Sequence, residues 1–135
     1  MQNAIAAVKA VIQNDNKFLT IKQNINGQIF WDLPGGKVDY GETPFDTLRR
    51  EVKEEVGLDI VIEKPLGLWW FFREKDKAQV VCTTFMCRAE NEEIDLENNP
   101  TEEEIVDCKW LTPAEFLSDK YPVSNESLKK LIANL

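Results

Sequence analysis

The chain has 135 residues, of which 43% are hydrophobic and 30% charged, and its formal net charge is −8. This size and apolar content suit one domain with a hydrophobic core, so we expect a single domain over residues 1–135. The acidic balance excludes a protein that binds duplex nucleic acid or an anionic membrane through a basic face. A phosphorylated substrate is still allowed, because a divalent cation can bridge acidic side chains to phosphate.

The sequence contains no histidine, which excludes Ser–His and Cys–His catalysis and imidazole metal sites. Catalysis must therefore use carboxylates, lysine, tyrosine or a metal. Cys82, Cys87 and Cys108 include no CxxC pair, so we interpret them as small apolar residues of an intracellular protein. The N-terminal residues lack a basic stretch, and no apolar run approaches transmembrane length, so we expect a cytoplasmic protein.

The first third of the chain predicts short strands separated by turns. Apolar residues at 4–12 and 17–22 flank Asn14-Asp15-Asn16 and predict a β-hairpin. Asn26-Gly27 predicts a second turn, and residues 29–33 predict a short strand that ends before a proline.

A glycine-rich loop over residues 35–42 precedes the clearest helix signal. Thr43 is a suitable N-cap, Pro44 suits the first helical position and Gly57 supplies a stop, so we predict a helix over residues 44–56. The remaining predicted elements are strands at 58–62, 68–72, 80–88 and 105–111, a short helix ending at 117, and an amphipathic helix over 125–135. The acidic segment 89–104 is expected to be irregular. The pattern indicates a mixed α/β fold.

The helix over residues 44–56 has an apolar and an acidic side. Its apolar side chains form a stripe that we expect to be buried: Phe45, Leu48, Val52 and Val56. Glu51, Glu54 and Glu55 lie together on the neighbouring arc, where like charges repel. The helical spacing lets Arg50 neutralise the charge of Glu54 only, so repulsion among the glutamates remains. A divalent cation such as Mg²⁺ is a natural further partner for these carboxylates. A solvated acidic face is the alternative.

The segment from Gly36 to Leu58 matches the pattern GX5EX7REUXEEXGU, with U aliphatic, at every fixed position. The chain therefore resembles the Nudix hydrolases, and Trp31-Asp32-Leu33-Pro34-Gly35 resembles the usual lead-in to their motif. This resemblance implies the Nudix fold, an α/β architecture in which a mixed β-sheet forms the middle of a three-layer α/β/α sandwich. It also implies a Mg²⁺-dependent hydrolase, with Mn²⁺ as an alternative cofactor, that cleaves a diphosphate linkage in a nucleotide derivative.

Roles for single residues follow from the same resemblance. Arg50 would hold a catalytic carboxylate in place, and Glu42 would support the geometry of loop and helix. The catalytic base would come from Glu51 or a neighbouring glutamate. The implied metal ligands are the Gly35 carbonyl and the carboxylates Glu51, Glu54, Glu55 and Glu103. Glu103 belongs to an acidic run, Glu102 to Glu104, and any of the three is a candidate metal ligand. The alternative is that this run is a solvated acidic loop.

Three further residues are candidate substrate contacts. Gly36 permits close backbone approach to phosphate, and Lys37 follows it directly. The segment from Tyr121 to Glu126 resembles the C-terminal region of MutT-type nucleoside triphosphate pyrophosphohydrolases, in which an asparagine at the position of Asn125 recognises a purine base. An amide suits this task because it both donates and accepts hydrogen bonds. Capping of the last helix is the alternative role.

The leading hypothesis is hydrolysis of a nucleoside triphosphate, including oxidised purines, to monophosphate and pyrophosphate. One alternative is a hydrolase of NDP-linked compounds such as NDP-sugars, ADP-ribose or dinucleoside polyphosphates. ADP-ribose is disfavoured, because the relevant enzymes carry a proline where this chain has Arg73-Glu74. Another is a non-catalytic Nudix-fold nucleotide-binding module. The expected partner is a small-molecule nucleotide, and a homodimer is an open alternative because dimers are common among Nudix proteins.

Overall fold

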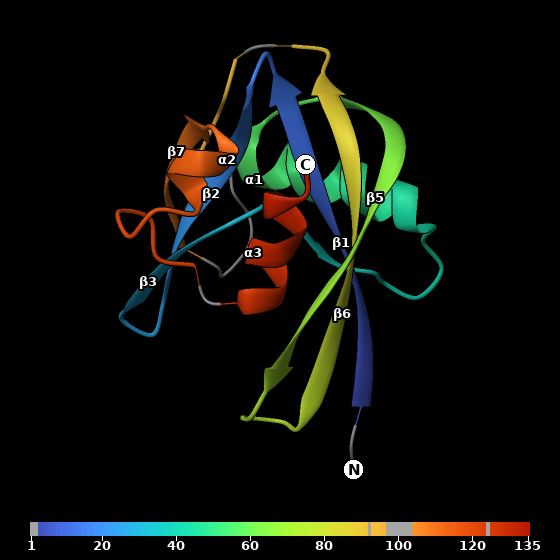
Figure 1. Cartoon of the computed structure of the whole chain (residues 1–135). Coiled ribbons are helices and arrows are strands. Elements are labelled where there is room, and N and C mark those ends of the chain that lie inside the picture. The colour runs from blue at the N-terminus through green and yellow to red at the C-terminus, as the bar shows by residue number, and fades with distance from the viewer. Residues whose placement is uncertain (1–2, 92, 97–103, 124) are drawn as a thin grey trace.

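The computed structural model describes residues 3–91, 93–96, 104–123 and 125–135 (Figure 1). Its strands are β1 (Asn3–Asn14), β2 (Lys17–Ile25), β3 (Gln28–Asp32), β4 (Gly35–Lys37), β5 (Ile60–Arg73), β6 (Ala78–Ala89) and β7 (Glu104–Leu111). Its helices are α1 (Pro44–Val56), α2 (Pro113–Phe116) and α3 (Glu126–Ala133). The predicted hairpin, turns and helices are therefore confirmed.

Two predictions about strands were wrong. Gly35–Lys37 was expected in a loop, but it forms strand β4 because it pairs with β1. The two strands predicted at 58–62 and 68–72 are one strand, β5, whose register against β6 shifts twice, once on each side of Lys64-Pro65. Proline lacks a ladder N–H, yet an edge strand with bulges accommodates it, and β5 lies at the edge of the sheet.

The sheet is mixed, with β1 at its centre. β1 runs parallel to β6 on one side and antiparallel to β4 on the other. β5 pairs with β6, and β2 pairs with both β3 and β7. The pairing of β1 with β4 matters for function, because it places Val8 opposite Gly36 and Lys9 opposite Gly35.

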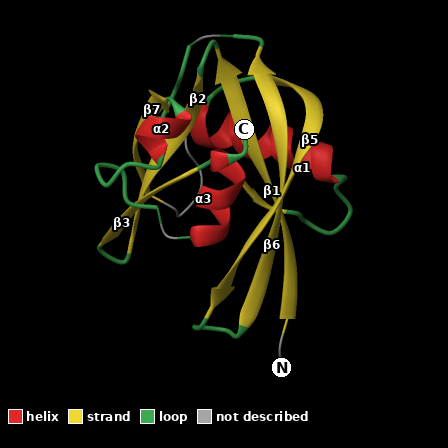
Figure 2. Cartoon of the chain, in the orientation of Figure 1, coloured by secondary structure: helices red, strands yellow, loops and turns green. Residues whose placement is uncertain are grey.

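The helices lie on both faces of the sheet, α1 on one and α2 with α3 on the other (Figure 2). Alternation along β1 sends Val8 and Ile12 to the core beneath α1 and Ala7 and Val11 to the core beneath α3. This is the expected three-layer α/β/α sandwich with a mixed sheet. None of the described helices has the length and apolar content needed to span a membrane.

Local sequence signals define both ends of α1. The Thr43 hydroxyl accepts a hydrogen bond from the Asp46 N–H at 3.1 Å, and Gly57 ends the helix at φ 76°. Leu48, Val52 and Val56 are fully buried as predicted, but Phe45 is 46% exposed and only packs at the edge, against Phe85. Phe45 lies in the first turn of α1, where the stripe reaches the rim of the core.

Candidate active site

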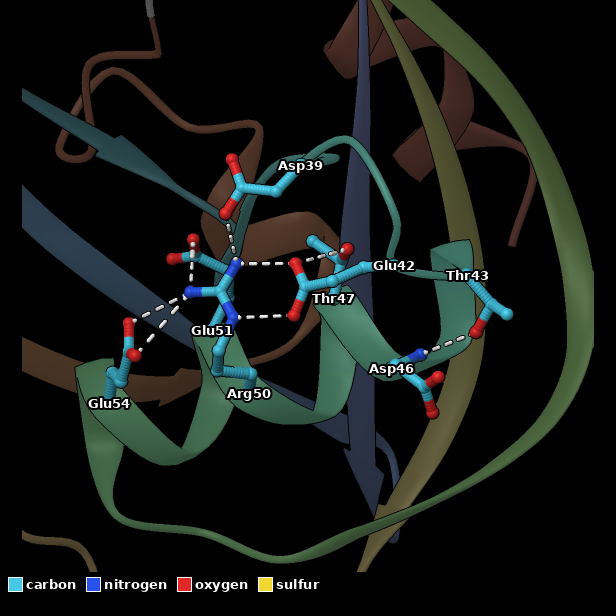
Figure 3. A network of polar contacts seen from close by, with 8 residues as sticks. All are labelled: Asp39, Glu42, Thr43, Asp46, Thr47, Arg50, Glu51 and Glu54. Carbon is cyan, nitrogen blue, oxygen red and sulfur yellow. Dashed lines mark hydrogen bonds and ion pairs between the residues drawn. The ribbon is translucent and has the colours of Figure 1, made fainter.

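Arg50, in the middle of α1, is the centre of a polar network that joins the helix to the loop before it (Figure 3). Its Nε and Nη2 donate to the two carboxylate oxygens of Glu42, both at 2.9 Å. Its Nη1 donates to Glu51 and Glu54 at 3.2 Å each, and Nη2 also donates to Asp39 at 3.0 Å. The expectation that Arg50 relieves only Glu54 was therefore wrong, because the loop before the helix brings further carboxylates to the same guanidinium.

This network is strongly charge-assisted. Hydrogen bonds from Arg50, together with one from the Thr47 hydroxyl, lower the pKa of Glu42 below its ordinary value, although partial desolvation opposes the shift. The hydrogen bonds with Glu42, and the negative charges of Glu51 and Glu42, raise the pKa of Arg50. Four carboxylates surround one guanidinium here. The excess of negative charge makes this region suitable for a further cation.

Glu55 occupies a different environment from Glu51 and Glu54. Its side chain is only 1% exposed, and its Oε1 accepts a hydrogen bond from the Gly35 N–H at 2.7 Å. Gly35 has φ 145°, and a Cβ there would lie 2.0 Å from the Val8 carbonyl oxygen. Only glycine fits between β1 and α1 at this position, so the Gly35 backbone can reach Glu55.

Gly36 lies against Glu51. A Cβ on Gly36 would fall 2.6 Å from the Glu51 carboxyl carbon. The sequence suggested that Gly36 allows a phosphate to approach the backbone, and the structure adds that Gly36 also leaves room for this carboxylate. The strand β4 and the helix α1 thus bring Gly35, Gly36, Glu51 and Glu55 together.

The donor set fits a hard divalent cation. Among the described residues, no three acidic or cysteine side chains are grouped closely enough to form a metal site by themselves. Mg²⁺ ordinarily needs no such cage, since it binds through one or two carboxylates and completes its shell with water and substrate phosphate. Of the later candidates, Glu102 and Glu103 lie outside the described residues, and only the backbone of Glu104 is described, in β7.

A cavity of about 430 Å³ opens beside this centre. The three candidate substrate contacts, Gly36, Lys37 and Asn125, all line it, and so does Gly35. Its aromatic lining includes Phe30, Phe71 and Phe72. Residues 69–72 of β5 are all aromatic. Trp69 is a core residue at 0% exposure, while Phe71 and Phe72 border the cavity.

Asn125 occupies the N-cap position of α3, but its side chain makes no capping hydrogen bond. The capping alternative is therefore not supported by the geometry. Ser124 lies outside the described residues.

Sequence reasoning missed four polar residues of the cavity: Lys9, Gln23, Asp32 and Arg73. Lys9 is 8% exposed, and its Nζ lies 3.1 Å from an Asp32 carboxylate oxygen. A signal was available, because Lys9 is the single charged residue within the apolar run of residues 4–12. A lysine there must be buried with a partner.

Comparisons with known proteins agree with this geometry. A family profile described as "NUDIX domain" matches residues 3–135. The chain is similar to "Nucleoside triphosphatase NudI" of Escherichia fergusonii, with 30% identity over 78% of this chain and 80% of the relative. It is also similar to "RNA pyrophosphohydrolase" of Ruthia magnifica, with 32% identity over 93% of this chain and 80% of the relative.

Among solved structures, the fold resembles that of a MutT protein from Methanosarcina mazei. The TM-score is 0.82 at 24% sequence identity, and the match covers 98% of this chain and 93% of the other. One relative is named for nucleoside triphosphates and the other for RNA, so they do not identify the substrate of this protein. The complete motif on α1, the sandwich fold and the family match over nearly the whole chain together show that this protein belongs to the Nudix family of hydrolases.

Proposed function

We propose that this protein is a Mg²⁺-dependent hydrolase of nucleoside triphosphates that releases the nucleoside monophosphate and pyrophosphate. The observation that carries the proposal is the position of the cavity. It is bounded by Gly35 and Gly36, which contact Glu55 and Glu51, and it extends to Asn125 and aromatic side chains. A nucleotide placed there has its phosphates near the glutamates and its base near Asn125.

The candidate metal ligands are the Gly35 carbonyl and the carboxylates of Glu51, Glu54 and Glu55. Glu103 belongs to the same proposal as a ligand from the acidic segment before β7. The bound cation would neutralise diphosphate oxygens and lower the pKa of a coordinated water. Mn²⁺, which accepts the same oxygen ligands, is an alternative.

The protein's own groups would position and deprotonate the attacking water. Glu51 or Glu54 accepts the proton of the water as its oxygen attacks phosphorus. The bridging oxygen departs with pyrophosphate if the α-phosphorus is attacked, or with the nucleoside monophosphate if the β-phosphorus is attacked. Arg50 holds both glutamates by hydrogen bonds of 3.2 Å, so it is a positioning residue for whichever of them is the base. Lys37, at the rim of the cavity, supplies positive charge for the phosphates.

The nucleoside triphosphate is favoured as substrate by Asn125 and the aromatic lining. A base can stack on the Phe30, Phe71 and Phe72 side of the cavity, while an amide pairs with its polar edge. The relative named as a nucleoside triphosphatase supports the same class. The second candidate is an NDP-linked compound, for which the same metal chemistry applies.

The deciding experiment is Glu55→Gln, measured as Mg²⁺-dependent hydrolysis of a panel of nucleoside triphosphates, NDP-sugars, ADP-ribose and dinucleoside polyphosphates. The nucleotide products are separated by chromatography, and pyrophosphate is assayed for the triphosphates. Glutamine keeps an oxygen that can accept from the Gly35 N–H, so the fold should persist, as circular dichroism can verify. Turnover should fall by about 100-fold or more, because a ligand is lost.

Glu74→Gln, on an exposed glutamate paired with Lys77, is the matched control and should retain full turnover. Unchanged turnover in folded Glu55→Gln would contradict the proposed metal site. Wild-type activity only on NDP-linked compounds would instead favour the second candidate.

A further inference from the structure

Strands β1, β5 and β6 extend beyond the helices at the end of the sheet near the N-terminus (Figure 1). In β5, Trp69 and Phe71 pack in the core beneath α3. Because side chains alternate along a strand, Leu68, Trp70 and Phe72 belong to the opposite side of the sheet. They are 56%, 48% and 66% exposed, so this aromatic-rich stretch is largely uncovered.

The neighbouring strands extend this uncovered surface. Trp70 is in register with Val81 of β6, and Val81 is in register with Ala6 of β1. One row nearer the end of the sheet, Gln79 is in register with Ala4. The apolar residues of the surface, which we call the open face, are Ala4, Ala6, Leu68, Trp70, Phe72 and Val81. None of them is charged, although charged residues make up 30% of the chain, and a contiguous exposed apolar patch marks a site of interaction.

α1 covers the same side of the sheet, but only beyond the open face. Its first turn packs on β6 through Phe45, whose ring centroid lies 5.5 Å from that of Phe85. Phe45 is still 46% exposed, so the apolar surface continues from the strands onto the start of the helix. The nucleotide cavity is lined by the alternate residues Ala7, Val80 and Cys82, and it therefore lies on the other side of the sheet.

The two ends of the open face differ in charge. The hairpin between β5 and β6, residues 73–77, has three basic and two acidic residues. At the other end, residues 39–46 include Asp39, Glu42 and Asp46 and no basic residue. When two copies are placed face to face with their strands antiparallel, each hairpin lies against residues 39–46 of the other copy. The attraction between these ends opposes the general repulsion between chains of net charge −8.

The exposed apolar area is sufficient for a dimer. An aromatic side chain contributes about 150–250 Å², so the exposed parts of Phe45, Trp70 and Phe72, with the smaller residues of the open face, present roughly 600 Å² per copy. Two copies then bury about 1,200 Å², which is above the minimum of about 1,000 Å² for a specific interface. Facing sheets pack about 10 Å apart with interdigitated side chains.

We propose that the open face is the interface of a homodimer, in which two copies pack sheet against sheet about a two-fold axis with antiparallel strands. A second copy fits the observations, because the uncharged patch meets itself and the oppositely charged ends meet each other. A contact of this kind uses the open face of both copies, so assembly stops at two. The dimer does not depend on the proposed function, since the nucleotide cavity lies on the other side of each sheet.

The first test is sedimentation equilibrium of the wild-type chain, without nucleotide, from about 1 to 200 µM, a range that covers micromolar dissociation constants. The proposal expects the mass to rise from the 15.6 kDa of one chain to twice that value. A constant mass of one chain, or a mass beyond two copies, overturns it.

The second test places charge in the open face. In Trp70→Glu or Ala6→Glu the new carboxylates of both copies enter one desolvated interface, so the dissociation constant should rise about tenfold or more. Ala6 is exposed, and its substitution removes no packed side chain, so Ala6→Glu decides if melting curves show that Trp70→Glu does not fold. Val106→Glu, at a side chain 49% exposed on β7, is the matched control and should dimerise as the wild type does. A folded Trp70→Glu or Ala6→Glu variant with wild-type dimerisation overturns the proposal.

The third test concerns the charged ends. Lys75→Glu makes the hairpin acidic and should raise the dissociation constant several-fold in low salt, because each hairpin then meets the acidic residues 39–46. Lys17→Glu, at the exposed start of β2, changes the net charge equally and is the control for general repulsion. If the two variants dimerise equally well, the antiparallel arrangement is overturned.

Discussion

Gly35 and Gly36 are adjacent, but different neighbours require a glycine at each position. A Cβ on Gly36 would meet the flexible end of Glu51, whereas a Cβ on Gly35 would meet the Val8 backbone at a φ of 145°. We predict that Gly36→Ala changes the free energy of unfolding by less than about 1 kcal/mol but lowers kcat by roughly 100-fold, because it displaces Glu51, a proposed catalytic group.

Gly35→Ala serves as the comparison for that variant. Its backbone must shift, so we expect a loss of about 1–3 kcal/mol or more in stability. Thermal unfolding and turnover of both variants provide the measurement. Equal destabilisation of the two proteins would show that Gly36 has a backbone role that its neighbours do not indicate.

Substitution of Asn125 can distinguish its two candidate roles, recognition of a base and capping of α3. Its side chain makes no capping hydrogen bond, so Asn125→Ala should not cause the loss of stability that removal of a helix cap causes. If the amide recognises the base, KM should rise several-fold for purine triphosphates and less for pyrimidine ones, in line with loss of about one hydrogen bond.

Thr112→Ala is the comparison for a lost cap, because the Thr112 hydroxyl does accept from the Glu115 N–H. That variant should lose about 1 kcal/mol of stability. A similar loss in Asn125→Ala, with equal KM effects on all bases, would assign Asn125 to capping.

Among the elements, α1 depends most on local signals. Thr43→Ala removes the hydrogen bond that caps the helix, and we expect a loss of about 1 kcal/mol, or a few degrees in melting temperature. Turnover should stay near the wild-type value, since the Thr43 hydroxyl accepts from the Asp46 N–H and has no dashed contact with Arg50 or the glutamates in Figure 3. Thr43→Ser keeps the hydroxyl and should behave as the wild type. A large loss of activity at unchanged stability would contradict this assignment.

Elements that are determined by nearby residues could be predicted from the sequence, whereas elements that depend on pairing with distant residues could not. Caps and stops lie within a few residues of the helix, so α1 was predicted over 44–56 as it is observed. β4 and the continuity of β5 depend on pairing with β1 and β6, which are remote in the sequence. Of the contacts of Arg50, only that with Glu54 follows from helical spacing; those with Glu42 and Asp39 depend on how the loop folds back.

At the scale of the whole molecule, the cavity is the feature that sequence reasoning could locate only in part. The motif on α1 predicted Gly35, Gly36 and Lys37 near the chemistry, and the C-terminal segment predicted Asn125. Lys9 and Asp32 join them only because β1 and β3 lie in one sheet. The motif predicts residues that are close together in the sequence, whereas Lys9 and Asp32 reach the cavity from separate strands and could be placed there only by the fold.

The acidic composition also gives the whole molecule a characteristic dependence on pH. The net charge is −8 at pH 7, and the sequence pI is about 4.6, so repulsion among carboxylates weakens as pH falls toward that value. Carboxylates that are paired in the folded protein have the opposite effect, because their contribution to stability is lost as pH falls. Hydrogen bonds with Arg50 lower the pKa of Glu42 from an ordinary 4.5, so its contribution to stability is present above that pH and is lost as pH falls through the lower folded pKa.

We therefore predict that the free energy of unfolding of the wild type falls below pH 4.5, as Glu42 is protonated and its hydrogen bonds with Arg50 weaken. Glu42→Gln should be less stable at neutral pH and should lose stability less steeply in acid, because glutamine does not titrate. Denaturant unfolding between about pH 3 and 7 measures both slopes, and Glu74→Gln, outside the network, should follow the wild type. If Glu42→Gln and the wild type lose stability in parallel, then other carboxylates, and not the contact with Arg50, determine acid unfolding.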